Sequence, residues 1–425
     1  MVDHRHRPSS SLGEATEGRE RLLALYAAAL RAVDGRAAVS RALRARPLAG
    51  PVWLVALGKA AESMTLGAFD VLGGRCAGGL LIGREAPSCP GPLVDHGVAW
   101  LVGDHPVPGE ASLACGERLI RQLAAIPAEA SLLFLISGGT SSLVEVPVAG
   151  VGLDALQRVN RWLLGSGLPI RDMNRVRTAL SQIKGGGLLG LLPRRPLRAL
   201  AVSDVPADDP AVIGSGLLVP TPDLAKSLAG LALAPWLRDW IAVGLAGRPS
   251  VPKGGPGIEL VARLEDAKEA VARAARTLSL PVRAHRTFLD GEASERGREL
   301  ARAVQDGPPG LQVWGGETTV RLPPNPGRGG RSQQLALAAA LELAGRSDCL
   351  LLAAGTDGSD GSTEDAGALV DGGTLERGTL GGLDPRDCLA RADAGRFLAA
   401  SGDLIHTGST GTNVMDLVLG LKLAP

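Results

Sequence analysis

Aromatic side chains are scarce in this chain of 425 residues, at 3% of the total, so its core must consist mainly of leucine, valine and alanine. An excess of charge is also lacking, because 45 lysines and arginines are balanced by 44 aspartates and glutamates. A net charge of +1 gives no overall field toward nucleic acid or an anionic membrane, and we expect neither partner. Any anionic partner must therefore be recognised at a local site.

Cysteine is rare as well. The five cysteines form no CxxC pair, which argues against a zinc ribbon, a redox motif and a disulfide framework. The first residues are polar and lack the apolar segment of a secretory signal, and we predict a disordered tail over residues 1–13. No uncharged apolar stretch reaches the ~18 residues that span a bilayer. These absences predict a cytoplasmic protein.

Glycine and proline, in contrast, are abundant, with 58 and 29 residues that cluster between short apolar runs. Helices are predicted over 14–46, 60–69 and 259–278. Strands are predicted over 52–57, 79–82, 132–136, 200–203, 311–314 and 350–353. This alternation is typical of an α/β fold, with a Rossmann-like, mostly parallel sheet in the N-terminal half and a second α/β domain in the C-terminal half.

The segment 246–257 is rich in glycine and proline and predicts a linker. The domains on either side are then an N-terminal Rossmann-like domain over 14–245 and a C-terminal α/β domain over 258–425. Ligands of open α/β sheets bind at the carboxyl ends of strands, so we expect the active site there, in the cleft between the two domains.

Two polar segments in the N-terminal half suit an anion. Lys59 follows a strand and opens a helix, where a phosphate could bind, although a solvated lysine explains its position equally well. Another loop offers backbone N–H groups and hydroxyls as an anion nest, unless it is an ordinary turn; its residues are Ser137, Gly138, Gly139, Thr140, Ser141 and Ser142.

A third segment carries polar side chains spaced three or four residues apart. On one helix they would share a face that binds carboxylate or phosphate, unless they form a solvated stripe; they are Asn174, Arg177, Ser181 and Lys184. His105 lies in a loop and is a further candidate for substrate binding.

In the C-terminal half, Arg331 stands near a helix start, where its guanidinium could contact a carboxylate or a transferring phosphoryl group. Asp357 and Asp360 follow one strand, as Asp204 follows another in the N-terminal half. Carboxylates together with substrate phosphates commonly hold Mg²⁺, although Asx turns explain such aspartates as well.

Nucleotide motifs are weak. The P-loop pattern GxxxxGK[ST] is absent, which disfavours a Walker-type NTPase. One GxGxxG match occurs at 185–190, but it follows a helical stretch rather than a strand, which is the wrong context for a dinucleotide-binding fingerprint.

Several short motifs occur in one order along the chain: LGKAAESM, HPVP, ISGGTSSL, NRVRTALSQIKGGGL, SDVPADDP, GGETTV, GRGGRSQQLAL, GTDGSDGSTEDAGA and TGSTGTNVMDL. Each alone is weak, but together the chain resembles the glycerate 2-kinases of the MOFRL type over residues 14–421. The resemblance implies ATP-dependent phosphorylation of D-glycerate at its 2-hydroxyl, giving 2-phosphoglycerate and ADP, with a divalent metal such as Mg²⁺. Lys59 and Arg331 match the two residues most often proposed for catalysis in that family.

Some positions depart from the family pattern. Ser332 and Gln334 stand where the family has Asn and Glu, Ala207 replaces a glycine, and residues 217–218 are Leu-Leu instead of Pro-Thr. These changes concern substrate specificity more than reaction class. Two alternatives stay open: an NAD(P)H-dependent hydroxypyruvate reductase, a label that several bacterial members of the family carry, and a non-catalytic sugar-acid-binding protein. A homodimer is also left open.

Overall fold

The computed structural model describes residues 10–424 and contains two compact units, each described here by itself. The N-terminal unit comprises Asp34–Ala262 together with Gly411–Asn413. The C-terminal unit comprises Arg263–Thr410, the residues from Val414 onward and the described residues up to Val33. Of the tail predicted over 1–13, residues 1–9 lie outside the described residues, and residues 10–13 belong to the first helix.

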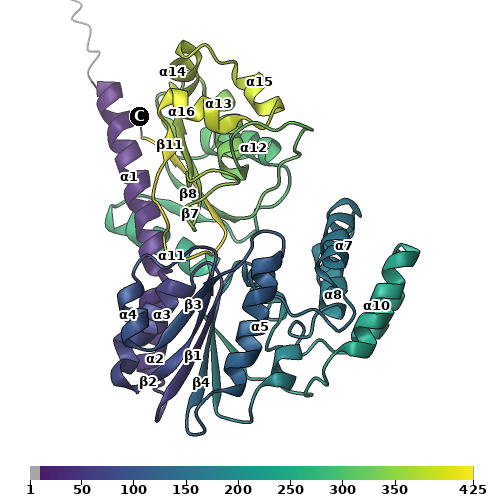
Figure 1. Cartoon of the computed structure of the whole chain (residues 1–425). Coiled ribbons are helices and arrows are strands. Elements are labelled where there is room, and N and C mark those ends of the chain that lie inside the picture. Colours follow the sequence, from purple (N-terminus) through teal and green to yellow (C-terminus); the bar gives the residue numbers. More distant parts are fainter. Residues whose placement is uncertain (1–9, 425) are drawn as a thin grey trace, which may run out of the picture. The chain divides into compact units, whose positions relative to one another are not determined.

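The N-terminal unit is built on a six-stranded sheet in the order β3-β2-β1-β4-β5-β6, in which each neighbouring pair is parallel (Figure 1). Its strands are β1 (Val52–Leu57), β2 (Cys76–Gly83), β3 (Val98–Val102), β4 (Ser131–Ile136), β5 (Leu197–Val202) and β6 (Ile258–Ala262). All six residues of β4 are buried, as expected for a central strand of a parallel sheet covered on both faces. The predicted fold class is confirmed for this unit.

Helices cover both faces of this sheet. The helices of this unit are α2 (Gly35–Ala45), α3 (Ala61–Leu72), α4 (Pro90–Asp95), α5 (Glu110–Ala124), α6 (Thr140–Leu143), α7 (Leu153–Gly165), α8 (Ile170–Ala179), α9 (Leu224–Ala229) and α10 (Pro235–Gly247). Leu119 of α5 shares a core with Val55 and Phe134 of the sheet. Leu54 points to the opposite face, because side chains alternate along a strand, and α3 packs against β1 there. A smaller apolar core joins α7, α8 and α10, which Figure 1 shows as a group beside the sheet.

Two predicted helices differ from the structure. The helix predicted over 14–46 is divided, because Asp34 caps α2 by accepting the Ala37 N–H at 2.8 Å. The helix predicted over 259–278 begins too early, since residues 258–262 form β6 alongside β5. The hydrogen bonds of that edge strand come from a partner distant in sequence, which local periodicity does not reveal.

The C-terminal unit contains a mixed sheet in the order β11-β10-β9-β12-β8-β7. Its strands are β7 (Val282–Ala284), β8 (Gly310–Gly316), β9 (Cys349–Gly355), β10 (Gly367–Asp371), β11 (Leu404–Ile405) and β12 (Asp416–Lys422). β12 runs antiparallel to both β8 and β9 between which it lies. The predicted strands over 311–314 and 350–353 lie within β8 and β9, and the second α/β fold is confirmed.

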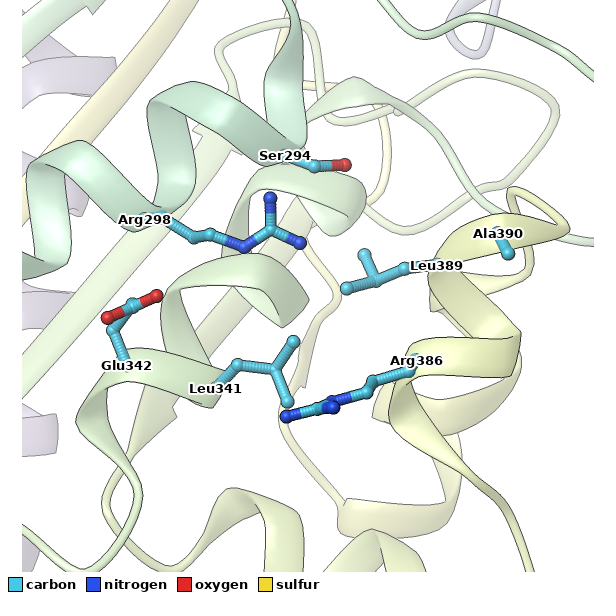
Figure 2. A pocket seen from close by; sticks show the side chains of 7 residues that line it. All are labelled: Ser294, Arg298, Leu341, Glu342, Arg386, Leu389 and Ala390. Atoms are coloured by element: carbon cyan, nitrogen blue, oxygen red, sulfur yellow. The ribbon is translucent and has the colours of Figure 1, made fainter.

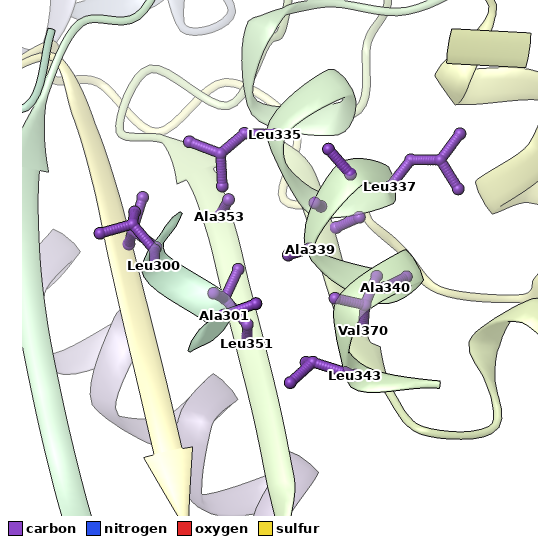
Figure 3. Packing of buried hydrophobic residues seen from close by; sticks show 14 of the residues in the cluster. Leu300, Ala301, Leu335, Leu337, Ala339, Ala340, Leu343, Leu351, Ala353 and Val370 are labelled. Atoms are coloured by element: carbon purple, nitrogen blue, oxygen red, sulfur yellow. The ribbon is translucent and has the colours of Figure 1, made fainter. Parts of the chain in front are cut away.

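Helices cover both faces of this second sheet. They are α1 (Ser10–Ala32), α11 (Leu264–Thr277), α12 (Ala293–Asp306), α13 (Arg331–Leu343), α14 (Thr374–Leu380), α15 (Pro385–Ala390) and α16 (Ala394–Ser401). Leu300 of α12 and Leu335 of α13 pack with Leu351 of β9 (Figure 3). On the other face, Leu350 lies against Gly18 of α1. Small alanines of α13 allow close packing, which compensates for the scarcity of aromatic residues.

The units divide the chain differently from the predicted domains, because α1 belongs to the C-terminal unit and β6 to the N-terminal one. The boundaries 14–245, 246–257 and 258–425 stay a prediction, since a compact unit is not by itself a segment that folds alone. None of the helices in residues 10–424 combines the length and apolar character that crossing a bilayer requires.

Candidate active site

Three neighbouring strands of the parallel sheet end in polar loops at the same edge. Lys59 follows β1, the loop from Ser137 follows β4, and Asp204 follows β5. The strand order reverses direction between β1 and β4, and in open α/β sheets this switch point is where a crevice for ligands forms. The N-terminal unit thus brings together three of the predicted site segments.

Lys59 is held in place by its backbone. Its N–H donates to the Gly138 carbonyl at 2.8 Å, and the N–H of Ala60 donates to Oγ of Ser137 at 3.0 Å. Gly58 has φ +114° and packs so closely on Ser137 that a β-carbon would overlap it. These contacts tie the turn after β1 to the loop after β4, with α3 beginning directly beyond at Ala61.

Two glycines form the middle of this group. A β-carbon at Gly139 would lie 3.2 Å from Cγ of Lys59 and 3.3 Å from Cδ2 of His105, so both side chains flank this glycine. A β-carbon at Gly138 would overlap the Asp204 carboxylate. A cation, an imidazole and a carboxylate therefore surround one glycine loop.

The hydroxyls of this loop are engaged within the protein. Thr140 donates to the Ser137 carbonyl at 2.7 Å, Ser142 donates to the Gly139 carbonyl at 3.1 Å, and Ser141 lies 2.7 Å from the Ser215 hydroxyl. In contrast, the N–H groups of Gly138 and Gly139 have no acceptor within the described part of the chain. An anion here would therefore be bound mainly by backbone N–H groups and by Lys59.

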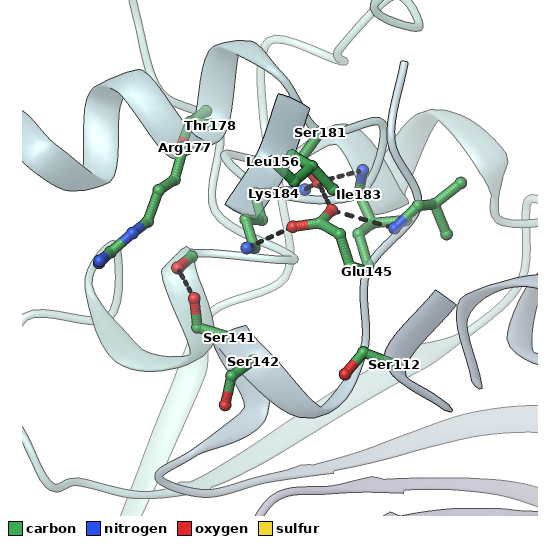
Figure 4. A network of polar contacts seen from close by, with 12 residues as sticks. Ser112, Ser141, Ser142, Glu145, Leu156, Arg177, Thr178, Ser181, Ile183 and Lys184 are labelled. Atoms are coloured by element: carbon green, nitrogen blue, oxygen red, sulfur yellow. Dashed lines mark hydrogen bonds and ion pairs between the residues drawn. The ribbon is translucent and has the colours of Figure 1, made fainter. Parts of the chain in front are cut away.

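Lys184 does not share a helix face with Arg177, and that prediction is wrong. Helix α8 ends at Ala179, and Lys184 lies beyond it in a buried position. Its Nζ lies 2.5 Å from Oε2 of Glu145, whose Oε1 accepts the Ser181 hydroxyl at 2.5 Å (Figure 4). This network fixes the segment after α8, and substrate binding by Lys184 stays a prediction.

Arg177 has neutral neighbours. Its Nε donates to Asn160 Oδ1 at 2.9 Å and its Nη1 to Asn174 Oδ1 at 3.1 Å. Burial lowers the pKa of Arg177 from its ordinary value. No carboxylate among residues 10–424 pairs with it, so its charge is oriented by amides without being neutralised, as suits an anionic ligand.

In the C-terminal unit, Arg331 is the first residue of α13 and is held by two acids. Its Nε donates to Asp416 Oδ2 at 2.5 Å, its Nη2 to Asp416 Oδ1 at 3.1 Å, and its Nη1 to Glu317. Burial alone would lower the pKa of Arg331, but the charges and hydrogen bonds of Asp416 and Glu317 raise it overall. The guanidinium is thus fixed in place and permanently charged.

Asp360, a predicted metal ligand, is buried against the backbone at the start of α13. Its Oδ1 accepts the Ser332 N–H at 3.1 Å and its Oδ2 accepts the Gln333 N–H at 2.8 Å, so it fixes the first turn of α13. Burial, and then the charge of Asp416, raises the pKa of Asp360 to about 7. Both oxygens of Asp360 thus already accept N–H groups, and magnesium binding by Asp360 stays a prediction.

The remaining metal candidates are Asp204 and Asp357. Oδ2 of Asp204 accepts Nδ2 of Asn413 at 3.3 Å, and Oδ1 of Asp357 accepts the Ser359 N–H at 3.1 Å. Across residues 10–424, no group of three or more His, Cys, Asp or Glu could hold a metal ion. Either aspartate could assist an ion that a nucleotide brings along, since Mg²⁺ then needs only one or two carboxylates from the protein.

Some residues of these networks were missed by the sequence reading, namely Glu145, Asn160, Arg248, Glu317, Asn413 and Asp416. Arg248 lies in the predicted linker, yet it donates to the Ser181 carbonyl at 2.6 Å and the Lys184 carbonyl at 2.7 Å. Each of these residues contacts a partner that is not its neighbour in sequence, so the spacing of residues along the chain does not reveal the contact. The motif strings GGETTV and TGSTGTNVMDL, which contain Glu317, Asn413 and Asp416, were the one available hint.

Two family models match the chain. A domain of unknown function, DUF4147, matches residues 21–233, and the MOFRL family matches residues 310–416. A D-glycerate 2-kinase from Thermotoga maritima is 36% identical over 380 residues, which cover 87% of this chain and 90% of that protein. An Agrobacterium vitis protein named as a hydroxypyruvate reductase is 35% identical, over 94% of this chain and 93% of its own.

Solved structures agree with the sequence matches. The crystal structure of a glycerate kinase from Thermotoga maritima superposes with a TM-score of 0.82 at 34% identity. The superposition covers 96% of this chain and 100% of that one. Both units of the chain therefore have counterparts in that structure.

Proposed function

The chain belongs to the DUF4147/MOFRL family of glycerate 2-kinases, and on that premise we propose that it transfers the γ-phosphoryl group of ATP to the 2-hydroxyl of D-glycerate. The products are 2-phosphoglycerate and ADP. The two candidate groups of side chains, one in each unit, suit this reaction in different ways.

The observation that carries the proposal is the arrangement around Gly138 and Gly139. Lys59 flanks these glycines, their N–H groups lack an acceptor in the described chain, and the loop lies at the switch point of a parallel sheet. Backbone N–H groups and a lysine at such a position are the elements that cradle a phosphate. We assign phosphate binding to this loop and charge neutralisation at the phosphoryl group to Lys59.

Arg331 supplies a second cation. Its planar fork is oriented by Asp416 and Glu317, so little conformational freedom remains to be lost when it contacts a phosphoryl group. Phosphoryl transfer depends on positioning and charge neutralisation more than on covalent chemistry with the protein. We propose that Lys59 and Arg331 both neutralise the phosphoryl group in transfer.

The chemical step balances without a further reactant. The 2-hydroxyl oxygen forms a bond to the γ-phosphorus, the bond from that phosphorus to the bridging oxygen breaks, and ADP leaves with the electron pair. A carboxylate accepts the hydroxyl proton. Arg177, oriented by Asn160 and Asn174, and His105 are proposed to hold the glycerate carboxylate.

A divalent ion bound with the nucleotide would offset the negative charge of the phosphates. Asp204 and Asp357 are the proposed protein ligands for it, because each follows a buried strand of its unit. Exclusion of water from the closed site would suppress ATP hydrolysis.

The reductase name of one relative makes hydroxypyruvate reduction the second candidate. The chain lacks the sequence pattern of a nicotinamide-binding site, which argues against this candidate. The GxGxxG match at 185–190 leads into the short 3₁₀ helix Gly187–Leu191 instead of joining a strand to a helix. The turn that does follow β1 is Gly58-Lys59-Ala60, which lacks the three glycines of a dinucleotide fingerprint.

Cofactor dependence separates the candidates. The purified protein is incubated with MgATP and D-glycerate and the release of ADP is followed, in parallel with hydroxypyruvate plus NADH or NADPH. ADP release that requires D-glycerate supports the kinase. Nicotinamide oxidation without ADP release supports the reductase, and no turnover in either assay supports the binding protein. The homodimer and the cytoplasmic location stay predictions.

A further inference from the structure

A pocket outside the candidate active site lies among α12, α13 and α15 of the C-terminal unit. Its volume is about 520 Å³, within the range of small-molecule sites. The lining consists of Ser294, Arg298, Leu341, Glu342, Arg386, Leu389 and Ala390. Figure 2 shows the guanidinium of Arg298 above Leu341 and Leu389 and that of Arg386 extending from α15 to the lower end of Leu341.

The two arginines of this pocket are unpaired. In the part of the chain that the structure describes, neither Arg298 nor Arg386 forms an ion pair or side-chain hydrogen bond. The one acidic lining residue, Glu342, is engaged elsewhere. Its Oε2 accepts Nε of Arg302 at 3.0 Å and its Oε1 accepts Nη2 at 2.9 Å. The pocket therefore carries two positive charges that its own carboxylate does not neutralise.

A buried neutral residue, Gln334, contacts two of the lining residues. Nε2 of Gln334 donates to Oγ of Ser294 at 3.1 Å and to the Leu389 carbonyl at 2.9 Å. This amide links α12 and α15 across the pocket and adds no negative charge. A carboxylate at this position would lack the N–H donors and would oppose an anion.

From these contacts we propose that the pocket binds a small phosphate monoester. Two guanidiniums from different helices suit a dianion, because a single carboxylate is satisfied by one arginine fork. Leu341, Leu389 and Ala390 provide an apolar floor for a short carbon skeleton. The site lies outside the proposed catalytic machinery, and its existence does not depend on the kinase reaction.

The pocket adjoins α13, the helix that begins at Arg331. Gln334 stands in the first turn of this helix, three residues after Arg331, and Leu341 lies near its end. A ligand that fixes Ser294 and Leu389 therefore acts on residues bonded to the turn that Arg331 opens. By linkage, any effect of the ligand on substrate binding must be matched by an equal effect of substrate on the ligand.

Hydrogen exchange measured on the full-length chain tests the proposal locally. Amide protection is followed in peptides covering 294–298 and 385–390 while inorganic phosphate, glycerol 3-phosphate or acetate is added. We expect saturable protection by both phosphate probes, tighter for glycerol 3-phosphate, and little by acetate. Equal protection by acetate, or none by phosphate, overturns the proposal.

Variants of the lining arginines test whether the protection by phosphate arises at this pocket. Arg298→Gln and Arg386→Gln should each weaken apparent phosphate binding about 10- to 100-fold, as expected for a lost charge-assisted hydrogen bond. Gln334→Glu should weaken it as well. Arg273→Gln is the charge-matched control, because Arg273 is exposed on α11 and makes only a 3.6 Å ion pair with Glu269. Protection that survives in both pocket variants, with normal circular dichroism, contradicts the site.

Discussion

Nε of Arg331 lies 2.5 Å from Oδ2 of Asp416, and Nη2 of the same guanidinium lies 3.1 Å from Oδ1. Asp416 opens β12 and Arg331 opens α13, so the pair joins two elements that are 85 residues apart. Glu317, directly after β8, receives the remaining nitrogen of the guanidinium. The sheet edge thus presents an arginine whose orientation is fixed before any ligand arrives, which is the property that catalysis by charge neutralisation requires.

Replacing Arg331 should therefore reduce turnover strongly. Arg331→Lys keeps a charge but loses the planar fork, and we expect kcat to fall by about 10²–10³, or ~3–4 kcal/mol of transition-state stabilisation. Arg346→Lys is the matched control, because Arg346 makes a similar two-bonded pair with Asp348 on the surface. Steady-state kinetics of both variants are compared, and near-normal kcat for folded Arg331→Lys would remove Arg331 from the mechanism.

Lys59 should matter to a similar degree. Lys59→Ala removes the charged side chain whose stem lies beside Gly139, while leaving the backbone bond from residue 59 to the Gly138 carbonyl possible. We expect kcat to fall by about 10²–10³. Lys253→Ala, at an exposed lysine, should leave kcat unchanged. If both alanine variants turn over alike, Lys59 is a solvated lysine, as the alternative interpretation of the sequence holds.

We expect the ion pair between Lys184 and Glu145 to contribute strongly to the free energy of unfolding. Lys184→Met leaves a buried carboxylate without its cation, and we expect the free energy of unfolding to fall by about 3–5 kcal/mol. Urea unfolding gives the value. Adding Glu145→Gln to Lys184→Met should recover part of the loss, because no buried charge then remains unpaired. A loss below about 1 kcal/mol for Lys184→Met would contradict a buried pair.

The titration of Asp360 makes stability depend on pH. Its pKa in the folded protein, about 7, is above the ordinary value of ~3.9, so the folded state holds a proton that the unfolded state releases. The resulting stabilisation is present at low pH and is lost as the pH rises from about 4 to about 7, by at most ~1.4 kcal/mol per pH unit.

Asp360→Asn lacks this titration. Relative to that variant, the wild type should lose unfolding free energy between about pH 4 and pH 7 and then level off. Urea unfolding of both proteins at several pH values gives the difference. A difference that does not change with pH would show that Asp360 ionises normally inside the protein.

The sequence predicted the parts of this fold whose signals are local. β1 matches its predicted bounds because Val52–Leu57 is a continuous apolar run, and the loops after β1, β4 and β5 were placed correctly at one sheet edge. β6 and β12 are among the strands that were not predicted, since their strand character depends on neighbours across the sheet. β12 is buried up to Leu421 between β8 and β9, and no local pattern identifies that position.

Side-chain pairing was harder to predict than the location of the loops. Lys184 was expected to share a polar helix face, but the helix ends at Ala179 and a glutamate 39 residues earlier binds the ammonium. Asp360 was expected to be a metal ligand, yet it accepts backbone N–H groups of α13. Spacing shows which residues follow a strand, whereas the partner that each one takes depends on contacts distant in sequence.

The regiochemistry of the product shows whether the phosphoryl group is transferred to the 2-hydroxyl. The protein is incubated with MgATP and D-glycerate, and enolase is added to the product with or without phosphoglycerate mutase. We expect enolase alone to consume the product, because the phosphoryl group is on the 2-hydroxyl. A product that enolase ignores until mutase is added would be 3-phosphoglycerate and would contradict the proposed transfer.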